Sequence, residues 1–276
     1  MKRPVFQWGL SSMGAPESTL ARIVALAAAS DLDFVELRGL EGTLDLPALL
    51  AAAPPGPLPR RPEIRLLGSS LRLIEAGEPE IAEFARFAEL AGQLGARYVR
   101  VFGGGQWGRK IGADQLQHAV GAVAACRRVL AARAPHVRML LETYETFSSA
   151  PACQRLNHCL EEPLEILWDS HHTWRLSGET PEETWRQLGP LVRHVHYKDS
   201  VHTPGREARY GYVAPGRGGF PTAELFALLV REQFRGGLSL EWERLWHPDL
   251  PPLDAVLPDF QRLRARVVAG EPLPHA

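Results

Sequence analysis

The chain has 276 residues, of which 45% are hydrophobic and 23% are charged, the composition of an ordinary soluble globular protein with a sizeable core. Its formal net charge is −1, which excludes a general electrostatic attraction to nucleic acid or to an anionic membrane. Three cysteines without a Cys-x-x-Cys pair form no disulfide framework, and we expect neither a signal peptide nor a membrane span, hence a cytoplasmic protein.

Eight short apolar runs, taken in chain order, predict buried strands. They are Phe6–Gly9, Phe34–Arg38, Ile64–Gly68, Tyr98–Phe102, Val137–Glu142, Leu164–Asp169, Val192–Tyr197 and Leu238–Trp242. Helical patterns occupy the intervals between these runs. They span residues 18–29, 78–94, 114–133, 151–160, 181–188, 221–231 and 253–268, and a less regular pattern lies within residues 46–62.

The alternation of strand and helix, about every 30–40 residues, is typical of βαβ units around a parallel sheet. Eight such units without a break in composition favour a closed (β/α)8 barrel over an open sheet. The proline-rich stretch at residues 54–62 fits a loop better than a domain linker. We therefore expect one domain over residues 1–276, with a tail that frays from about residue 270.

Four of the predicted strands end in a side chain that can bind a metal ion: Glu142, Asp169, His196 and Glu241. Any one of them alone would more often be solvated or ion-paired. Burial of an unpaired ionisable group is costly, so four on successive strand ends indicate convergence on a positive charge. In a barrel these ends share the C-terminal mouth, where barrel enzymes hold their active sites. Three carboxylates and one imidazole suit Mn²⁺ or Mg²⁺, with Zn²⁺ and Co²⁺ as alternatives.

Successive side chains of a strand face opposite sides of the sheet. If the candidate ligands face the barrel interior, every second residue before them on the same strand faces the interior too. Arg138 and Glu165 then lie inside on neighbouring strands, deeper than the candidate ligands, and we expect a structural ion pair between them. Arg100 faces the interior from the fourth strand and is a candidate for binding an anionic substrate. Arg38 and Glu36 face the interior from the second strand, where we expect Arg38 to neutralise Glu36; the alternative is that Arg38 binds an anionic substrate.

Three further residues are candidates for substrate binding. His172, just after the sixth strand, is expected to donate a hydrogen bond to the substrate; the alternative is an ordinary loop histidine. Lys198, at the end of the seventh strand, can reach the same pocket; the alternative is a surface lysine paired with Asp199. Arg217 belongs to a basic loop over residues 200–220, which either closes over an acidic or phosphorylated substrate or is simply solvated.

Glycines after the fourth strand match the Gly-x-Gly-x-x-Gly pattern through Gly103, Gly105 and Gly108. In a dinucleotide-binding unit, the next strand would end in an acidic residue at a fixed distance, and none fits here. We therefore reject a dinucleotide site and expect a flexible substrate loop. No Gly-x-Ser-x-Gly elbow of a serine hydrolase is present.

Five stretches of the sequence form a recognisable set. They are Tyr98-Val99-Arg100-Val101-Phe102-Gly103-Gly104, Leu141-Glu142-Thr143, Trp168-Asp169-Ser170-His171-His172, His194-Val195-His196-Tyr197-Lys198-Asp199 and Leu238-Ser239-Leu240-Glu241-Trp242-Glu243. Together they resemble the sugar phosphate isomerase/epimerase group of the xylose isomerase-like TIM barrels. The resemblance covers nearly the whole chain, and the last two stretches are its most specific part.

The resemblance implies one divalent metal ion. By position in the motifs, its ligands are Glu142, Asp169, His196 and Glu241. The resemblance also implies that His172 contacts the substrate. Beyond the metal-binding histidine this chain departs from the related ketose epimerases, because Lys198 and Asp199 stand where their loop differs. The metal site is therefore implied more firmly than the reaction.

Our leading hypothesis is a metal-dependent isomerase or epimerase of a sugar or polyol-derived keto compound, acting through an enediolate with Glu142 and Glu241 as the proton-transfer pair. The first alternative is a dehydratase (a lyase) of a cyclitol or keto acid, with Lys198 or His172 as general acid. A hydrolase like the abasic-site endonucleases is disfavoured because the third and fourth strands end without histidine. A non-catalytic binding protein is disfavoured by the intact ligand set, and a homo-oligomer stays open.

Overall fold

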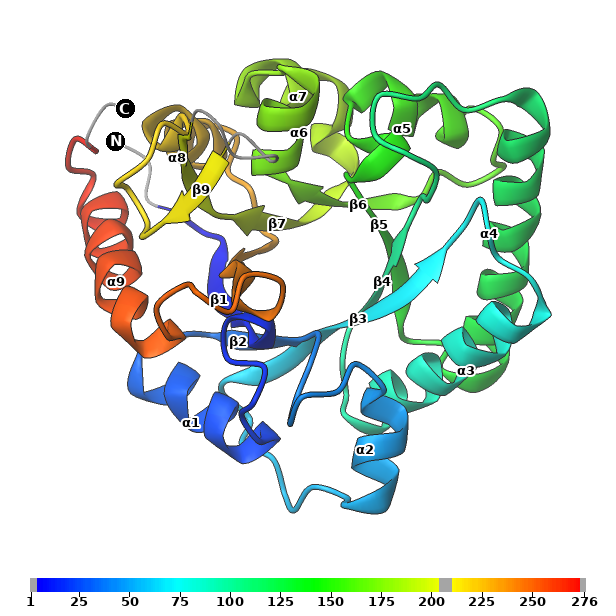
Figure 1. Ribbon diagram of the computed structural model, residues 1–276, viewed down its shortest axis with the longest axis horizontal. Coiled ribbons are helices and arrows are strands. Elements are labelled where there is room, and N and C mark those ends of the chain that lie inside the picture. Colours follow the sequence, from blue (N-terminus) through cyan, green and yellow to red (C-terminus); the bar gives the residue numbers. More distant parts are fainter. Residues whose placement is uncertain (1–3, 204–209, 274–276) are drawn as a thin grey trace.

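Eight parallel strands close into a barrel in the computed structural model, which describes residues 4–203 and 210–273. The order around the barrel is β1-β10-β7-β6-β5-β4-β3-β2, and Figure 1 shows the ring of helices around it. The barrel strands are β1 (Gln7–Ser11), β2 (Phe34–Leu37), β3 (Glu63–Arg72), β4 (Tyr98–Phe102), β5 (Arg138–Glu142), β6 (Glu165–Asp169), β7 (Val192–Tyr197) and β10 (Gly237–Leu240). The predicted (β/α)8 barrel is confirmed.

The helices surround the barrel, and most of them pack an apolar face on it. They are α1 (Leu20–Ala29), α2 (Leu46–Ala52), α3 (Glu78–Gln93), α4 (Ala113–Arg133), α5 (Ala150–Asn157), α6 (Ser170–Ser177), α7 (Pro181–Leu188), α8 (Thr222–Arg231) and α9 (Leu253–Ala269). Short 3-10 helices are η1 (Ser12–Gly14), η2 (Glu145–Phe147), η3 (Gly189–Leu191) and η4 (Glu243–Leu245). No helix within the described residues is both long and apolar enough to cross a membrane.

Local sequence signals explain where several of these helices begin and end. Thr180 and Glu183 form a reciprocal capping box at the start of α7, and Pro181 occupies its first turn. The last helix ends at Gly270, which has a positive φ of 71° and therefore favours glycine. The tail that we expected to fray from about residue 270 includes residues 274–276, which lie outside the described residues.

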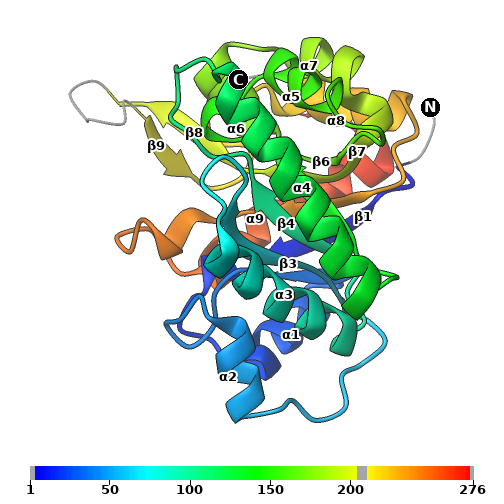
Figure 2. The same cartoon turned by 90° about the vertical axis from the view of Figure 1, so that its right-hand side faces the viewer.

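The alternation did not predict two elements near the mouth. The first is α6, a short helix whose serine, histidine and threonine residues have low helix propensity. Asp169 starts it, since its Oδ1 accepts a hydrogen bond from the backbone N–H of His172 at 2.8 Å. The second is an antiparallel hairpin, β8 (Asp199–His202) with β9 (Tyr210–Val213), inside the region expected to be a loop. Figure 2 shows the hairpin extending from the same side of the barrel as the segment after β10.

The barrel interior is filled by the side chains that strand alternation places there. Leu66, Tyr98, Leu140 and Leu167 pack together as one buried cluster below the mouth. Near the base, the predicted ion pair is confirmed, because Arg138 Nη1 lies 2.7 Å from Glu165 Oε1. The mouth above this layer is therefore a separate region, and its side chains are free to serve a purpose other than packing.

The ring of Phe34 fills the interior at the level of two glycines. A Cβ added at Gly9 would fall well inside van der Waals distance of this ring, and one at Gly237 would also crowd it. Glycine on the neighbouring strands is therefore what allows an aromatic side chain to cross the barrel here.

We expect Gly9→Ala to lower the free energy of unfolding by roughly 1–3 kcal/mol, because the extra methyl overpacks the interior. The matched control is Gly121→Ala on α4, where an added Cβ meets nothing within 4 Å. That exchange should raise stability by about 0.5–1 kcal/mol, because alanine is the better helix former. Urea unfolding of both variants tests the pair, and equal stability of Gly9→Ala and the parent would contradict this account of the interior.

Candidate metal centre

The structure brings the four candidate ligands together at the mouth of the barrel. Glu142, Asp169 and His196 lie on β5, β6 and β7, and Glu241 directly follows β10. All four side chains are buried, and one potential ligand atom from each lies within 4.8 Å of the others. Strand ends that are far apart in the sequence therefore form one compact cluster of three carboxylates and an imidazole.

The distances within this cluster suit a single small cation. His196 Nδ1 lies 3.1 Å from Glu241 Oε2, 3.7 Å from Glu142 Oε1 and 3.9 Å from Asp169 Oδ2. Ligand atoms that bind an ion such as Zn²⁺ at about 2.0–2.2 Å are separated from one another by no more than about 4.4 Å. A divalent ion can therefore contact all four residues with small adjustments of their side chains.

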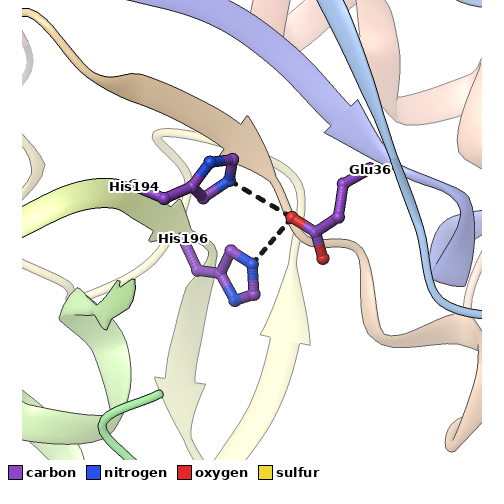
Figure 3. A group of neighbouring side chains, drawn as sticks. All are labelled: Glu36, His194 and His196. Atoms are coloured by element: carbon purple, nitrogen blue, oxygen red, sulfur yellow. Dashed lines mark hydrogen bonds and ion pairs between the residues drawn. The ribbon is translucent and has the colours of Figure 1, made fainter. Parts of the chain in front are cut away.

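Glu36 holds the imidazole of His196 in the orientation that a ligand needs. Glu36 Oε2 lies 2.8 Å from His196 Nε2 and 3.2 Å from His194 Nε2, as Figure 3 shows. Ser239 Oγ donates to the same oxygen at 3.1 Å, and Ser11 Oγ donates to Glu36 Oε1 at 3.2 Å. Because Nε2 is engaged by a carboxylate, Nδ1 is the nitrogen that faces the other candidate ligands.

This arrangement corrects the interpretation of Arg38 as the partner of Glu36. The carboxylate of Glu36 is engaged by histidines and serines instead, and Arg38 donates to the Gly68 carbonyl and to Ser70 Oγ. Burial would raise the pKa of Glu36, but His196 and His194 hold it well below the usual value. Glu36 is thus an ionised, buried acceptor under the candidate metal site.

We expect Glu36→Gln to weaken divalent-metal binding by about 10–100-fold, the usual effect of removing a carboxylate that orients a metal-binding histidine. The exchange keeps the side-chain volume, so the fold should persist. Metal titration followed by fluorescence or calorimetry measures the change, with Glu83→Gln on the exposed face of α3 as the control. Unchanged affinity in Glu36→Gln would show that Glu36 does not orient the histidine for a metal.

Three atoms of the cluster are buried without a hydrogen bond of good geometry among the described residues: Glu142 Oε2, Asp169 Oδ2 and His196 Nδ1. Each lies within ion-pair distance of a charged neighbour, so their charges are partly compensated although their hydrogen-bonding capacity is not used. Buried polar atoms in this condition are costly unless something binds them. The residues present therefore fit a bound cation.

The buried charges lead to the same conclusion. When His196 is neutral, as a metal ligand must be, five buried carboxylates of the described residues that line the mouth or contact a candidate ligand face three buried arginine and lysine side chains of the mouth. The carboxylates are Glu36, Glu142, Asp169, Glu241 and Glu243, and the cations are Arg38, Arg100 and Lys198. This excess of two negative charges is what one divalent ion would neutralise.

Lys198 is buried at the mouth, so the surface-lysine alternative is wrong. Its ammonium lies 2.8 Å from Asp169 Oδ2 and also pairs with Glu241 and Glu243. Burial would lower its pKa, but these carboxylates raise the pKa well above the ordinary value. Asp199, the partner expected for a surface lysine, instead accepts hydrogen bonds from backbone N–H groups of the loop that follows the hairpin.

The two glutamates of the cluster have different surroundings. Burial would raise the pKa of Glu142, but Arg100, with its Nε 3.0 Å from Glu142 Oε2, and His196 hold the pKa below its usual value. Burial raises the pKa of Glu241 above its usual value despite the neighbouring His196 and Lys198. Two carboxylates at one site that differ in this way are suited to different roles in proton transfer.

A cavity of about 570 Å³ opens above the cluster. Glu142 and Glu241 line it, whereas Asp169 and His196 do not and lie beneath its floor. Other lining residues come from every side of the mouth: Met13, Arg38, Ser70, Arg72, Arg100, Phe102, Tyr144, Glu145, His172, Arg175, Leu176, Lys198, Tyr210, Tyr212, Glu243, Trp246 and His247. The volume is in the range of small-molecule sites.

The predicted substrate-binding residues fall into two groups. His172, Arg100 and Lys198 all line the cavity, and the His172 ring stacks on Tyr144 with centroids 4.6 Å apart. Arg217 does not line it: its side chain is 64% exposed and pairs with Asp259 of α9 at 3.1 Å. The other arginines of the basic loop, at positions 206 and 209, lie outside the described residues.

Sequence reasoning missed several residues of the cavity wall. Glu243 follows Glu241 by two positions, and strand alternation extended past the end of β10 would have placed both on one face. Tyr212 lies on the hairpin, within the 200–220 loop that was expected either to close over the substrate or to be solvated. Trp246 lies after η4, the segment that begins with Glu243. No periodic signal in the sequence places these aromatic side chains over the mouth.

Comparison with known proteins identifies the family. The family model described as xylose isomerase-like TIM barrel matches residues 62–266. The chain belongs to this family. A search of curated protein sequences gave no match.

Several solved structures share the fold over nearly their full lengths. The probable 3-DHS dehydratase AsbF of Bacillus anthracis is 19% identical, with a TM-score of 0.72 and coverage of 95% of this chain and 98% of its own. The IOLI protein with a bound zinc atom is 16% identical, with a TM-score of 0.72 and coverage of 96% and 99%. The D-allulose 3-epimerase from Methylomonas sp., in complex with D-allulose, is 15% identical, with a TM-score of 0.62 and coverage of 98% and 96%. At these identities the comparisons establish the fold, and the reaction must be argued from the site.

Proposed function

We propose that this xylose isomerase-like barrel is a divalent-metal-dependent isomerase or epimerase of a sugar or polyol-derived keto compound. One observation supports this reaction class most strongly. Of the four candidate ligands, the two that line the cavity are Glu142 and Glu241, the carboxylates expected to move a proton. Asp169 and His196, which lie beneath the floor, would serve as ligands only.

The four ligands would hold one divalent ion, Mn²⁺ or Mg²⁺ in the first place and Zn²⁺ or Co²⁺ as alternatives. Such an ion would supply Lewis-acid stabilisation of the negative charge that develops when a proton leaves the carbon next to a carbonyl. Lys198 contacts two of the ligand oxygens in this structure, and Glu243 offers its ammonium a partner outside the ligand set. We expect the ammonium to move toward Glu243 when the ion binds.

The protein side chains would then do the proton transfer. In the barrel order, β5 and β10 are separated by β6 and β7, so Glu142 and Glu241 approach the cavity from different sides. A carboxylate on each side permits removal of a proton from one face and its return on the other, which is epimerisation. If one carboxylate alone reaches carbon, the same site performs an aldose–ketose isomerisation. His172 and Arg100 would orient the oxygen atoms of the substrate from the cavity wall.

A dehydratase is the second candidate, and the position of Lys198 favours it. The buried ammonium lines the cavity beside Glu241, so a proton donor and a carboxylate base face the same space. After proton removal next to a carbonyl, a donor at this point could assist the departure of a β-hydroxyl group as water. The substrate would then be a cyclitol or a keto acid.

One experiment separates the two reactions. Keto sugars and cyclitols are incubated with the protein and Mn²⁺, Mg²⁺, Co²⁺ or Zn²⁺, and the products are analysed by mass and by ultraviolet absorbance. An isomer of unchanged mass supports the isomerase or epimerase. A product lighter by one water molecule, with a new conjugated chromophore, supports the dehydratase. Turnover that is unaffected by a chelator would contradict both proposals.

A further inference from the structure

A buried arginine of the cavity wall has no carboxylate partner within the described part of the chain. Arg38, directly after β2, is 4% exposed, and no aspartate or glutamate oxygen described here lies within 4.0 Å of its guanidinium. Its hydrogen bonds go to uncharged groups, from Nη1 to the Gly68 carbonyl at 3.3 Å and from Nη2 to Ser70 Oγ at 3.2 Å. Buried charges of this kind are normally paired.

The neighbouring cations of the same wall have such partners. Arg100 pairs with Glu142 at 3.0 Å, and Arg72 pairs with Glu145 at 3.0 Å. Lys198 contacts three carboxylates. Glu36 lies two residues before Arg38 in the sequence. Its carboxylate is engaged by His194 and His196 and therefore does not pair with Arg38.

The backbone at Gly68 of β3 makes room for this arginine. A Cβ at Gly68 would lie 2.9 Å from Arg38 Cδ and 2.9 Å from Arg100 Nη2. Glycine therefore allows both side chains to pass side by side into the mouth. The two guanidinium groups face the cavity together, although among the described residues only Arg100 has a carboxylate partner.

The pKa of Arg38 agrees with the lack of a close counterion among the described residues. Burial, and next the charge of Arg100, lower the pKa of Arg38 to about 9, although the more distant carboxylates of Glu142 and Glu241 oppose this. The group is still charged at neutral pH. An oxyanion in contact with it would offset the cost of burial through charge-assisted hydrogen bonds.

We propose that Arg38 binds an anionic oxygen group of the substrate, a carboxylate or a phosphate, and that the substrate is therefore an acidic keto compound. This inference rests on the proposed function, because it takes the cavity above the metal cluster as the substrate site. It deepens that function by naming the substrate class and the residue that selects it.

The test measures binding to the Mn²⁺-loaded protein by calorimetry, with matched neutral and anionic compounds. The pairs are dihydroxyacetone with its phosphate, fructose with fructose 6-phosphate, and fructose with fructuronate. We expect at least one anionic member to bind about tenfold or more tightly than its neutral counterpart. Preference for a phosphate or for fructuronate distinguishes the two anion classes.

Substitutions of Arg38 then assign the preference. Arg38→Gln should reduce it to within about twofold, and Arg38→Lys should keep part of it, because a charge without the planar fork remains. Arg38→Met serves as a second removal variant, since an apolar side chain of similar length is tolerated at buried charged positions. Arg22→Gln, an exposed arginine of α1, is the matched control and should keep the full preference.

Two outcomes would overturn the inference: equal binding within every pair in the parent protein, or a preference that survives removal of Arg38 in a folded variant. Both are independent of turnover. If the anion preference depends on Arg38 while no isomer or dehydrated product forms, the anion site stands and the proposed reaction fails. If turnover occurs with neutral substrates only, the reaction stands and the anion site fails.

Discussion

Glu142→Gln and Glu241→Gln should each lower kcat by about 100-fold or more while the metal ion stays bound, which is the usual scale for loss of a general base. Both carboxylates line the cavity, and both belong to the candidate ligand set. Glutamine keeps the size of the side chain and a carbonyl oxygen that can still contact a metal, but it cannot accept a proton from carbon at neutral pH.

The measurement follows two quantities in metal-loaded variants: turnover, and exchange of the substrate's α-hydrogen with D₂O. If Glu142 and Glu241 act on opposite faces of the substrate carbon, one variant should lose removal of the proton from one face. The other variant should lose return of the proton to the opposite face. Glu83→Gln, on the exposed surface of α3, should match the parent in both. Exchange and turnover retained in both cavity variants would assign proton transfer to His172 or Lys198 instead.

One divalent metal ion per chain is the second expected result, and His196→Ala should weaken its binding by more than about 100-fold. The expected loss exceeds the 10–100-fold typical for an outer partner of a ligand, because a ligand itself is removed. The fold should persist, since His196 lies at the mouth, above the leucine and tyrosine layer of the barrel interior. Elemental analysis measures the number of metal ions per chain, metal titration measures the affinity, and far-ultraviolet circular dichroism measures whether the fold persists.

The main alternative to a divalent ion at this site is the ammonium of Lys198. It contacts Asp169 and Glu241 in this structure, so it could be the permanent cation of the cluster. In that case the parent protein would bind no divalent ion, and Lys198→Met would create a metal site that the parent lacks. Two or more ions per chain, or an ion located away from the four residues, would equally contradict the prediction.

The sequence by itself determined the barrel and the composition of its mouth. Strand alternation and helix periodicity are local properties, so they can be recognised without knowledge of distant contacts. Alternation predicted an ion pair between Arg138 and Glu165, and the structure pairs them at 2.7 Å, although the side chain of Arg138 is 54% exposed. It also placed Glu142 and His196 on inward faces at the C-terminal ends of their strands. Parallel strands in a closed barrel bring those ends to one side, and their convergence follows from topology alone.

At the mouth of the barrel, only the tertiary structure decided which charged groups meet. Glu36 and His196 are 160 positions apart in the sequence, and their hydrogen bond depends on how the strands are aligned around the barrel. This contact leaves Arg38 without the partner that proximity along the strand suggested. Lys198 is buried rather than solvated because Asp169, Glu241 and Glu243 from other parts of the chain surround it.

The shape of the cavity was decided in the same way. The hairpin β8–β9 and the segment after β10 contribute Tyr212 and Trp246 to its wall, while Arg217 turns toward Asp259 on α9. Loops after barrel strands have no periodic side-chain pattern, and their course depends on contacts with other loops. The sequence therefore predicts which strand ends carry the chemistry, whereas the substrate-facing surface is set by packing between segments that are distant in the chain.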